Sequence, residues 1–308
     1  MFNIETYLDS LPEDTEEINV SNKGIKSLDV RRFKNLKTLN CYNNQLTSLH
    51  LNENLQTLWC NYNQLTSLNL NENLQTLYCN YNQLTSLDSK NLQYLSCYNN
   101  QLTCLHLNEN LQTLSCSNNQ LTSLHLNENL QTLSCSNNQL TSLHLNENLQ
   151  TLYCHNNQLT SLDSKNLKTL YCYYNQLTSL HLNEKLEELY CSHNQLTSLH
   201  LNENLQTLNC SFNLLTSLYL NEKLQTIVYN DNPIYEIINS DVIDIINRKI
   251  RVLNQFRYLY YSLKFKTRLR DILWVKIREP KIRMKYSHNY LVEHLHEETD
   301  LDELLDNW

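Results

Sequence analysis

A phrase of 18 or 19 residues repeats along most of the chain and limits its fold more than any other feature. The phrase is close to NLQTLxCxxNQLTSLHLNE, and its cysteines are spaced by 19, 19, 18, 19, 19, 19, 18, 19 and 19 residues. These cysteines are Cys41, Cys60, Cys79, Cys97, Cys116, Cys135, Cys154, Cys172, Cys191 and Cys210. Degenerate copies extend the pattern to residues 18–234, which makes about twelve copies of 18 to 21 residues. So short and regular a period predicts a solenoid in which each copy packs against its neighbours.

The composition excludes several classes of protein. The 308 residues include 63 Leu but one Gly and no Ala. Phosphate-cradling loops and dinucleotide fingerprints need glycine, so neither is expected. No stretch approaches the roughly 18 consecutive apolar residues of a transmembrane helix. The acidic start of the chain lacks the apolar core of a secretory signal, so we expect a protein that is not secreted.

Each copy contains a short alternating segment that predicts a β-strand. In x-L-x-C-x, Leu58 and Cys60 point to one face, and Trp59 and Asn61 to the other. Stacked copies would form a parallel sheet with strands about 4.8 Å apart, burying the Leu and Cys face. The period leaves no room for a long helix, so we expect the LTSLHL segment to return as extended chain or a short helical turn.

The phrase reads L-x-x-L-x-C-x-x-N-x-L and resembles the leucine-rich repeat family. In one copy the match consists of Leu55, Leu58, Cys60, Asn63 and Leu65. The resemblance implies an α/β solenoid with a short-repeat parallel sheet on its concave face. We expect a C-terminal helical segment after it.

An asparagine recurs where each strand should turn. Its amide can pair backbone groups of neighbouring copies, and buried backbone groups must be paired. We therefore predict a structural ladder made of Asn44, Asn63, Asn82, Asn100, Asn119, Asn138, Asn157, Asn175, Asn194, Asn213 and Asn232.

The cysteines favour packing over chemistry. Inward side chains of neighbouring strands run parallel, which suits disulfide geometry poorly. Cys154 and His155 should face opposite sides of the sheet, so they cannot form a nucleophilic dyad. Reduced, buried thiols fit an intracellular compartment. Cys104, which replaces a serine of the phrase, is expected to be exposed.

A histidine column follows the return segments. Stacked imidazoles could bind Zn²⁺ or sense pH, but a solvated copy of a duplicated motif explains them more simply. The column comprises His50, His106, His125, His144, His181 and His200. We therefore predict no metal site, no cofactor and no catalytic residue.

The outward strand positions vary between copies and point to a contact surface. Two aromatic groups flank a small centre containing Ser115, Ser117, Ser134 and Ser136, and Glu188 is the main charge there. Exposed Tyr and Trp are favoured anchors for protein partners, although aromatic residues also suit strands and stack along them. Phosphate binding is disfavoured because no Lys or Arg stripe lies on this face. The predicted partner-binding residues are Trp59, Tyr62, Tyr78, Tyr81, Tyr153, Tyr171, Tyr173 and Tyr190.

We divide the chain into an N-terminal capping segment (1–17), the solenoid (18–234) and a C-terminal helical cap (235–308). The cap is basic and then acidic, with thirteen Lys or Arg against two acids over residues 248–285. Its acids favour a cap over the last repeat, since solenoids need caps. The alternative is a ligase adaptor or effector whose basic helix engages a second macromolecule, such as nucleic acid or an anionic membrane.

The whole chain also resembles leucine-rich repeat proteins of giant amoeba-infecting viruses. The Ala-free composition, the opening YLDSLPEDTEEINVSNKGIKSL and the ending DLDELLDNW carry this resemblance. It implies an intracellular protein in the cytoplasm of a host cell, without assigned chemistry. We expect a monomer that binds an unknown protein, such as a host protein, and does not bind nucleic acid.

Overall fold

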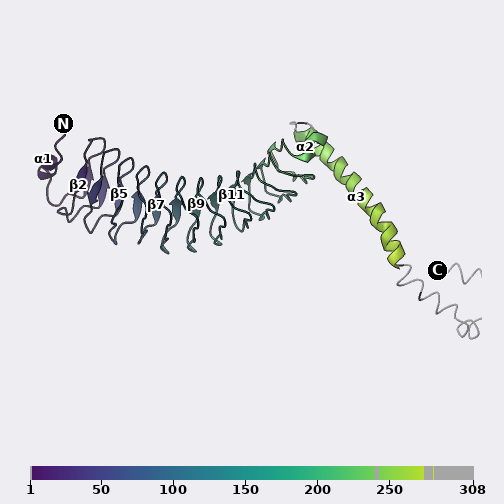
Figure 1. The fold of residues 1–308 in the computed structure, drawn as a ribbon, viewed down its shortest axis with the longest axis horizontal. Coiled ribbons are helices and arrows are strands. Elements are labelled where there is room, and N and C mark those ends of the chain that lie inside the picture. Colours follow the sequence, from purple (N-terminus) through teal and green to yellow (C-terminus); the bar gives the residue numbers. More distant parts are fainter. Residues whose placement is uncertain (1, 239, 241–242, 274–279, 281–308) are drawn as a thin grey trace, which may run out of the picture. The chain divides into compact units, whose positions relative to one another are not determined.

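The computed structural model describes residues 2–238, 240, 243–273 and 280. The chain divides into two compact units, residues 1–250 and 251–308. The first unit contains the repeats, which stack one behind another from α1 to α2 (Figure 1). It is a parallel-sheet solenoid, as the repeat period predicts.

One parallel sheet of twelve strands runs through this unit, in the order β1-β3-β5-β6-β7-β8-β9-β10-β11-β12-β13-β14. Each strand has three residues: β1 (Glu17–Asn19), β3 (Thr38–Asn40), β5 (Thr57–Trp59), β6 (Thr76–Tyr78), β7 (Tyr94–Ser96), β8 (Thr113–Ser115), β9 (Thr132–Ser134), β10 (Thr151–Tyr153), β11 (Thr169–Tyr171), β12 (Glu188–Tyr190), β13 (Thr207–Asn209) and β14 (Thr226–Val228). Equivalent residues of successive copies are in register, so that Trp59 lies beside Tyr78. Each sequence position of the phrase therefore becomes a straight row across the sheet.

The core consists of the Leu and Cys rows. Leu58 and Cys60 are fully buried, and so are the cysteines of the other nine copies. The strand is shorter than the expected x-L-x-C-x, because β5 ends at Trp59. The ladder nevertheless continues past it, since the amide of Cys60 donates to the carbonyl of Tyr78 at 2.8 Å. All eleven cysteines are free thiols, and Cys104 is exposed as expected.

The return segments are extended, one of the two outcomes that the period allowed. Near the N-terminus they pair as β2 (Ser27–Asp29) and β4 (Ser48–His50). Further along, they meet in isolated parallel bridges such as Asp88 with His106. Among the described residues no helix lies between β1 and β14.

Helices lie at both ends of the strand series. At its N-terminal end, α1 (Ile4–Asp9) buries Leu8. After β14, α2 (Pro233–Ile238) buries Ile234 and Ile238, and α3 (Ile243–Leu273) buries Ile246 and Ile250 in its first turns. This is the expected C-terminal helical segment. The domain boundaries at residues 17 and 234 remain predictions, and the acidic tail after residue 285 lies outside the described residues.

Candidate functional site

The asparagines of the predicted ladder hold neighbouring copies together. The side chain of Asn138 accepts from the amide of Leu121 at 3.0 Å and donates to the carbonyls of Cys116 and Cys135 at 3.1 and 3.0 Å. The other ten ladder asparagines likewise pair backbone groups of their own copy and the preceding one. Because these side chains are buried, their hydrogen bonds fix the position of each copy relative to the preceding one.

A second asparagine ladder on the return side escaped the sequence analysis. The side chain of Asn146 donates to the carbonyls of Asn127 and Leu130. Four copies later, Asn221 donates in the same way to the carbonyls of Asn202 and Leu205. The sequence signal is the Asn of LNE, which recurs in most copies.

The outer face of the sheet, opposite the Leu and Cys rows, carries two blocks of aromatic residues. The N-terminal aromatic block comprises Tyr42, Trp59, Tyr62, Tyr78, Tyr81, Tyr94 and Tyr98. The C-terminal aromatic block comprises Tyr153, His155, Tyr171, Tyr173, Tyr174, Tyr190, His193 and Phe212. All eight predicted partner-binding residues lie in these blocks. Seven further members were left out of that prediction; Tyr94 is the least obvious, because other copies mostly have Thr there.

The strand residues of each block stack in register. In the N-terminal block the rings of Trp59 and Tyr78 lie 6.1 Å apart and nearly parallel. In the C-terminal block the rings of Tyr153 and Tyr171 are 4.9 Å apart, and those of Tyr171 and Tyr190 are 4.3 Å apart. All five side chains are half-buried, because each covers part of its neighbour. The stacking supplies some stability and orders the rings before any partner arrives.

A second aromatic row lies in the turn that follows each strand, where the backbone is left-handed. Copies elsewhere have Asn there, for example Asn118 at φ +55°, which is the side chain that best tolerates this backbone. In five copies of the two blocks an aromatic ring replaces this Asn, at φ between +51° and +55°. These residues are Tyr62, Tyr81, Tyr174, His193 and Phe212.

Four of these rings are exposed and that of His193 is half-buried, and all five continue the stacks. The rings of Tyr62 and Tyr81 lie 4.2 Å apart, with exposed fractions of 42% and 40%. In the other block Tyr174, His193 and Phe212 stack in sequence at 4.0 and 4.2 Å. A left-handed backbone costs a bulky L-residue about 1–2 kcal/mol, so these rings occupy positions where folding alone favours Asn.

Between the blocks lies the serine floor, made of Ser96, Ser115, Ser117, Ser134 and Ser136. The hydroxyls of Ser117 and Ser134 are 2.8 Å apart, and the amide of Ser136 donates to the Ser117 hydroxyl. At the C-terminal side the Ser136 hydroxyl pairs with Nδ1 of His155 at 2.9 Å. The floor therefore satisfies much of its own hydrogen bonding, and its small side chains leave the neighbouring rings standing above it.

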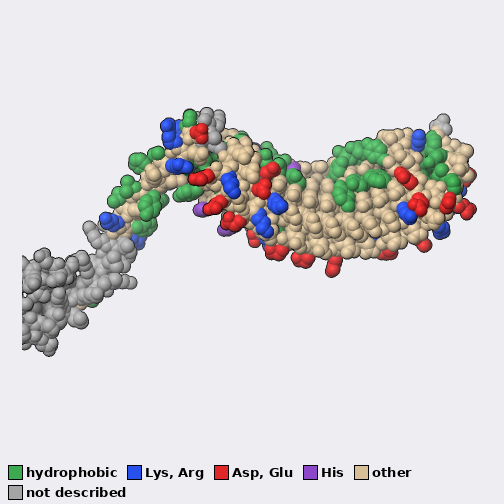
Figure 2. Space-filling view, turned by 180° about the vertical axis from the view of Figure 1, so that it is seen from behind, with side chains coloured by type: hydrophobic (Ala, Val, Ile, Leu, Met, Phe, Trp, Pro, Cys, Tyr) green, Lys and Arg blue, Asp and Glu red, His purple; other side chains and the backbone are tan. Residues whose placement is uncertain are grey.

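The electrostatics of this face are those of neutral rings partly removed from water. Burial raises the pKa of the Tyr94, Tyr98 and Tyr173 phenols and lowers the pKa of the His155 imidazole. For Tyr171 burial is again the largest cause of a raised pKa, followed by Tyr190 and the Glu188 carboxylate. Figure 2 shows hydrophobic side chains gathered toward the N-terminal end of the solenoid, with uncharged polar surface beside them.

Cys154 and His155, which are adjacent in the sequence, do not face each other. Burial raises the pKa of the Cys154 thiol well above its usual value, while His155 lies on the opposite, outer face of the sheet. Among the described residues no group of three His, Cys, Asp or Glu side chains could hold a metal ion. No helix in that same part of the chain combines the length and apolarity needed to cross a bilayer.

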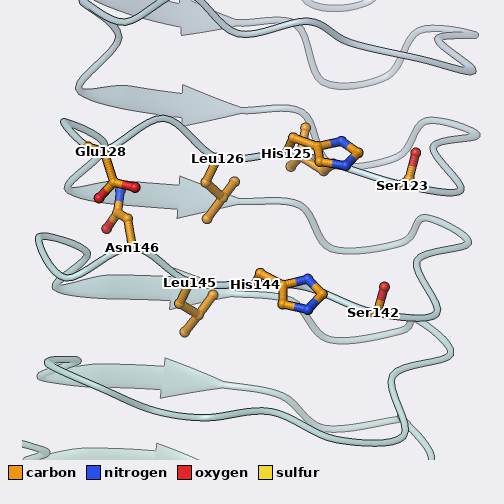
Figure 3. A pocket seen from close by; sticks show the side chains of 9 residues that line it. Ser123, His125, Leu126, Glu128, Ser142, His144, Leu145 and Asn146 are labelled. Atoms are coloured by element: carbon orange, nitrogen blue, oxygen red, sulfur yellow. The ribbon is translucent and has the colours of Figure 1, made fainter.

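The histidine column lies on the return side and is exposed. A shallow hollow of about 280 Å³ lies there between two copies, and Figure 3 shows His125 and His144 at equivalent positions in it. Glu128 and Asn146 lie at the other end of the hollow. Two imidazoles from successive copies do not make a coordination sphere, so this geometry is that of a repeated, solvated motif.

Comparisons with known proteins agree with the fold. A family model described as leucine-rich repeats (2 copies) matches residues 128–164 and 147–184. YopM from Yersinia enterocolitica WA-314 is 29% identical with a TM-score of 0.59, over 73% of this chain and 57% of that one. YopM from Yersinia pestis, described as a leucine-rich effector protein, is 26% identical with a TM-score of 0.55, over 70% and 78%. No curated protein matches the chain in sequence.

A third solved structure bears on the cysteines. The functional domain of InlJ from Listeria monocytogenes, described as including a cysteine ladder, is 28% identical with a TM-score of 0.52, over 70% of this chain and 63% of that one. In the present chain the ten cysteines of successive copies are all fully buried. With its twelve-stranded parallel sheet and extended returns, the chain has the fold of a leucine-rich repeat protein.

Proposed function

We propose that the chain is a non-catalytic module that binds a protein partner through the two aromatic blocks of the outer sheet face. Leucine-rich repeat solenoids are typically interaction scaffolds, which makes this class of function the first expectation. The observation that carries the proposal is the set of exposed rings in left-handed turns. Asn would hold those turns at lower cost, so the rings have a use other than building the solenoid.

The block residues have the properties of interface anchors. Tyr and Trp supply a large contact area with few rotatable bonds, and their order here is fixed by stacking. Charges are scarce on the face, and protein interface cores are likewise depleted in charged residues. The predicted anchors are Trp59, Tyr62, Tyr78, Tyr81, Tyr153, Tyr171, Tyr173 and Tyr190, and we add Tyr174 and Phe212.

Affinity purification or proximity labelling with the full chain tests this proposal. The same experiment is run with Tyr153, Tyr171 and Tyr190 all changed to Ser, and with Asn209→Ser as the matched control on the same row. Partners recovered with the parent and the control but lost with the triple variant support the proposal. A partner list unchanged by the triple variant, or lost only when the chain ends at Pro233, argues against it.

A second candidate is an effector or ligase adaptor whose C-terminal helix engages another macromolecule. It is favoured by α3, where Phe256 and Tyr258 are 70% and 78% exposed and Lys264 lies over the ring of Tyr260. YopM of Yersinia pestis is itself described as an effector. Retention on heparin or anionic vesicles that falls steeply with salt and requires α3 would support this candidate.

The place of action stays a prediction. Ten buried, reduced thiols suit an intracellular compartment, and we propose the cytoplasm of a host cell. Imaging of the tagged protein during expression in such a cell tests this location. A tag that accumulates only in the medium or the secretory pathway would contradict it.

A further inference from the structure

The distance between the aromatic blocks can be worked out from the register of the sheet. Tyr78 on β6 and Tyr153 on β10 occupy the same row, and Ser96, Ser115 and Ser134 lie between them. Four strand spacings of about 4.8 Å separate the two rings by about 19 Å. Subtracting one van der Waals contact of about 3.5 Å leaves a gap of about 16 Å.

The next row narrows the gap. Tyr98 and His155 follow β7 and β10, three spacings apart, which gives about 14 Å between rings and about 11 Å of clear width. Ser117 and Ser136 form the floor in this row. The serine floor and the facing sides of the two blocks therefore make a trough that runs along the strands. The clear width of about 11 Å in this narrower row suits an α-helix, whose diameter with side chains is about 10–12 Å.

The turn row is wider than the two rows before it. In the turn row, Tyr81 stands on one side at φ +53° and Tyr174 on the other at φ +52°. The floor copies between them keep Asn at this turn, including Asn118 and Asn137. Tyr81 and Tyr174 are therefore five strand spacings apart, about 24 Å, because Asn99 and Asn156 hold the turns of the copies that carry Tyr98 and His155.

The polarity of the serine floor limits which partner surfaces can pack against it. The Ser117 and Ser134 hydroxyls pair with each other, that of Ser136 pairs with His155, and that of Ser96 donates to Asn80, so four of the five floor hydroxyls already have a partner. From β5 to β11 the outward strand residues are Thr, Ser, Tyr and Trp, without a charged side chain. A charged surface would lose water here without gaining a counter-charge.

We infer that the trough binds a single α-helix of the protein partner, lying along the strand direction with an uncharged face against the serine floor. The rings of Tyr78 and Tyr153 flank this helix in one row, and those of Tyr98 and His155 flank it in the next. The inference deepens the proposed function and rests on it, since both place the partner on the outer sheet face.

Filling the trough tests the inference directly. Ser115→Tyr with Ser134→Tyr places rings on the floor in a row where Tyr153, Tyr171 and Tyr190 are already accommodated in neighbouring copies. Asn209→Tyr adds the same side chain to the same row outside the trough and serves as the control. The single variant Ser117→Tyr fills the trough from the next row, where Tyr98 and Tyr173 occur, in case the double variant folds poorly.

The probes are two phage-displayed libraries selected against the full-length chain. One randomises the exposed face of a helix in a helical-bundle scaffold, and the other displays linear peptides with prolines that prevent helix formation. We expect the helical library to yield clones that bind the parent and Asn209→Tyr within about threefold of each other. Their affinity for the filled variants should fall at least 30-fold.

Two results would overturn the inference. One is helical clones that bind the filled variants as well as the parent. The other is floor-dependent binding that comes from the linear library alone, because the trough would then hold extended chain. Clones that tolerate filling but lose affinity for the Tyr153, Tyr171 and Tyr190 to Ser variant would leave the proposed function standing while refuting the helix in the trough.

Discussion

Asn138 offers the sharpest test of how the solenoid is held together. Replacing it with Ala removes the acceptor for the Leu121 amide and the donor to the carbonyls of Cys116 and Cys135. The two carbonyls keep another partner each, because Asn119 and Asn157 also donate to them. The Leu121 amide is left as a buried donor without its side-chain acceptor, a loss of about 1–3 kcal/mol.

Asn138→Asp should cost more than Asn138→Ala. The aspartate keeps an acceptor for the Leu121 amide but points a second carboxylate oxygen at the two carbonyls that the amide now bonds. The folded state therefore disfavours the charged form and raises the pKa of this carboxyl. The destabilisation should weaken as the pH falls toward that raised pKa, because the protonated carboxyl can donate.

Urea unfolding of the full chain measures both changes in the free energy of unfolding, and hydrogen exchange reports the Leu121 amide. The matched control is Asn129→Ala, which removes one exposed bond to the carbonyl of Glu109 and should cost less than about 0.5 kcal/mol. Asn138→Ala costing no more than this control, with unchanged exchange at Leu121, would refute the role of the ladder.

Three further predictions concern the core, the pH response and the C-terminal end. A thiol reagent should label Cys104 in the native protein and leave the ten buried thiols unreacted until unfolding, because burial raises their pKa; early labelling of Cys116 would contradict this. Burial lowers the pKa of His155, so the unfolded chain takes up the proton first and stability should fall as the pH drops below about 6.5. In His155→Ser the urea midpoint should therefore depend less on pH below about 6.5. A midpoint that changes with pH as it does in the parent would contradict this role of His155. Ile246→Ser should speed hydrogen exchange in the C-terminal copies, whereas the exposed Phe256→Ser should not.

The solenoid could be predicted from the sequence because the same pattern of buried and turn residues recurs in about twelve copies. An inward Leu and Cys, a strand of period 2 and an Asn at the turn recur in nearly every copy, and the fold follows them. The length of the strand was harder to predict. The backbone of each copy leaves the strand at Trp59 or its equivalent while Cys60 still bonds to the next copy, and side-chain alternation does not distinguish these two states.

The candidate site was only partly accessible to sequence reasoning. Alternation places Trp59 and Tyr78 outward, and counting copies puts them in one row. Strict alternation beyond Cys60 would turn Tyr62 inward, so our prediction of Tyr62 and Tyr81 as outward contacts did not follow from the pattern; the structure places both in left-handed turns. That difference depends on backbone dihedrals that the surrounding Asn residues only hint at. The energetic cost of placing a ring in such a turn is inferred from the positive φ values, which only the structure provides.

We propose that the aromatic blocks are contact surfaces more than scaffold, and the variant with Tyr153, Tyr171 and Tyr190 changed to Ser tests this proposal most directly. The variant loses two ring pairs, each worth roughly 0.2–1 kcal/mol, so it should unfold at most about 2 kcal/mol more easily than the parent. Leu152→Ala, a fully buried core control, should cost about 2–5 kcal/mol. Affinity for the captured partner should fall by about 2 kcal/mol or more in the triple Ser variant if even one ring is a hot spot. A triple variant that unfolds like Leu152→Ala, or that binds the partner as tightly as the parent, would show that the rings serve the scaffold and would contradict the account.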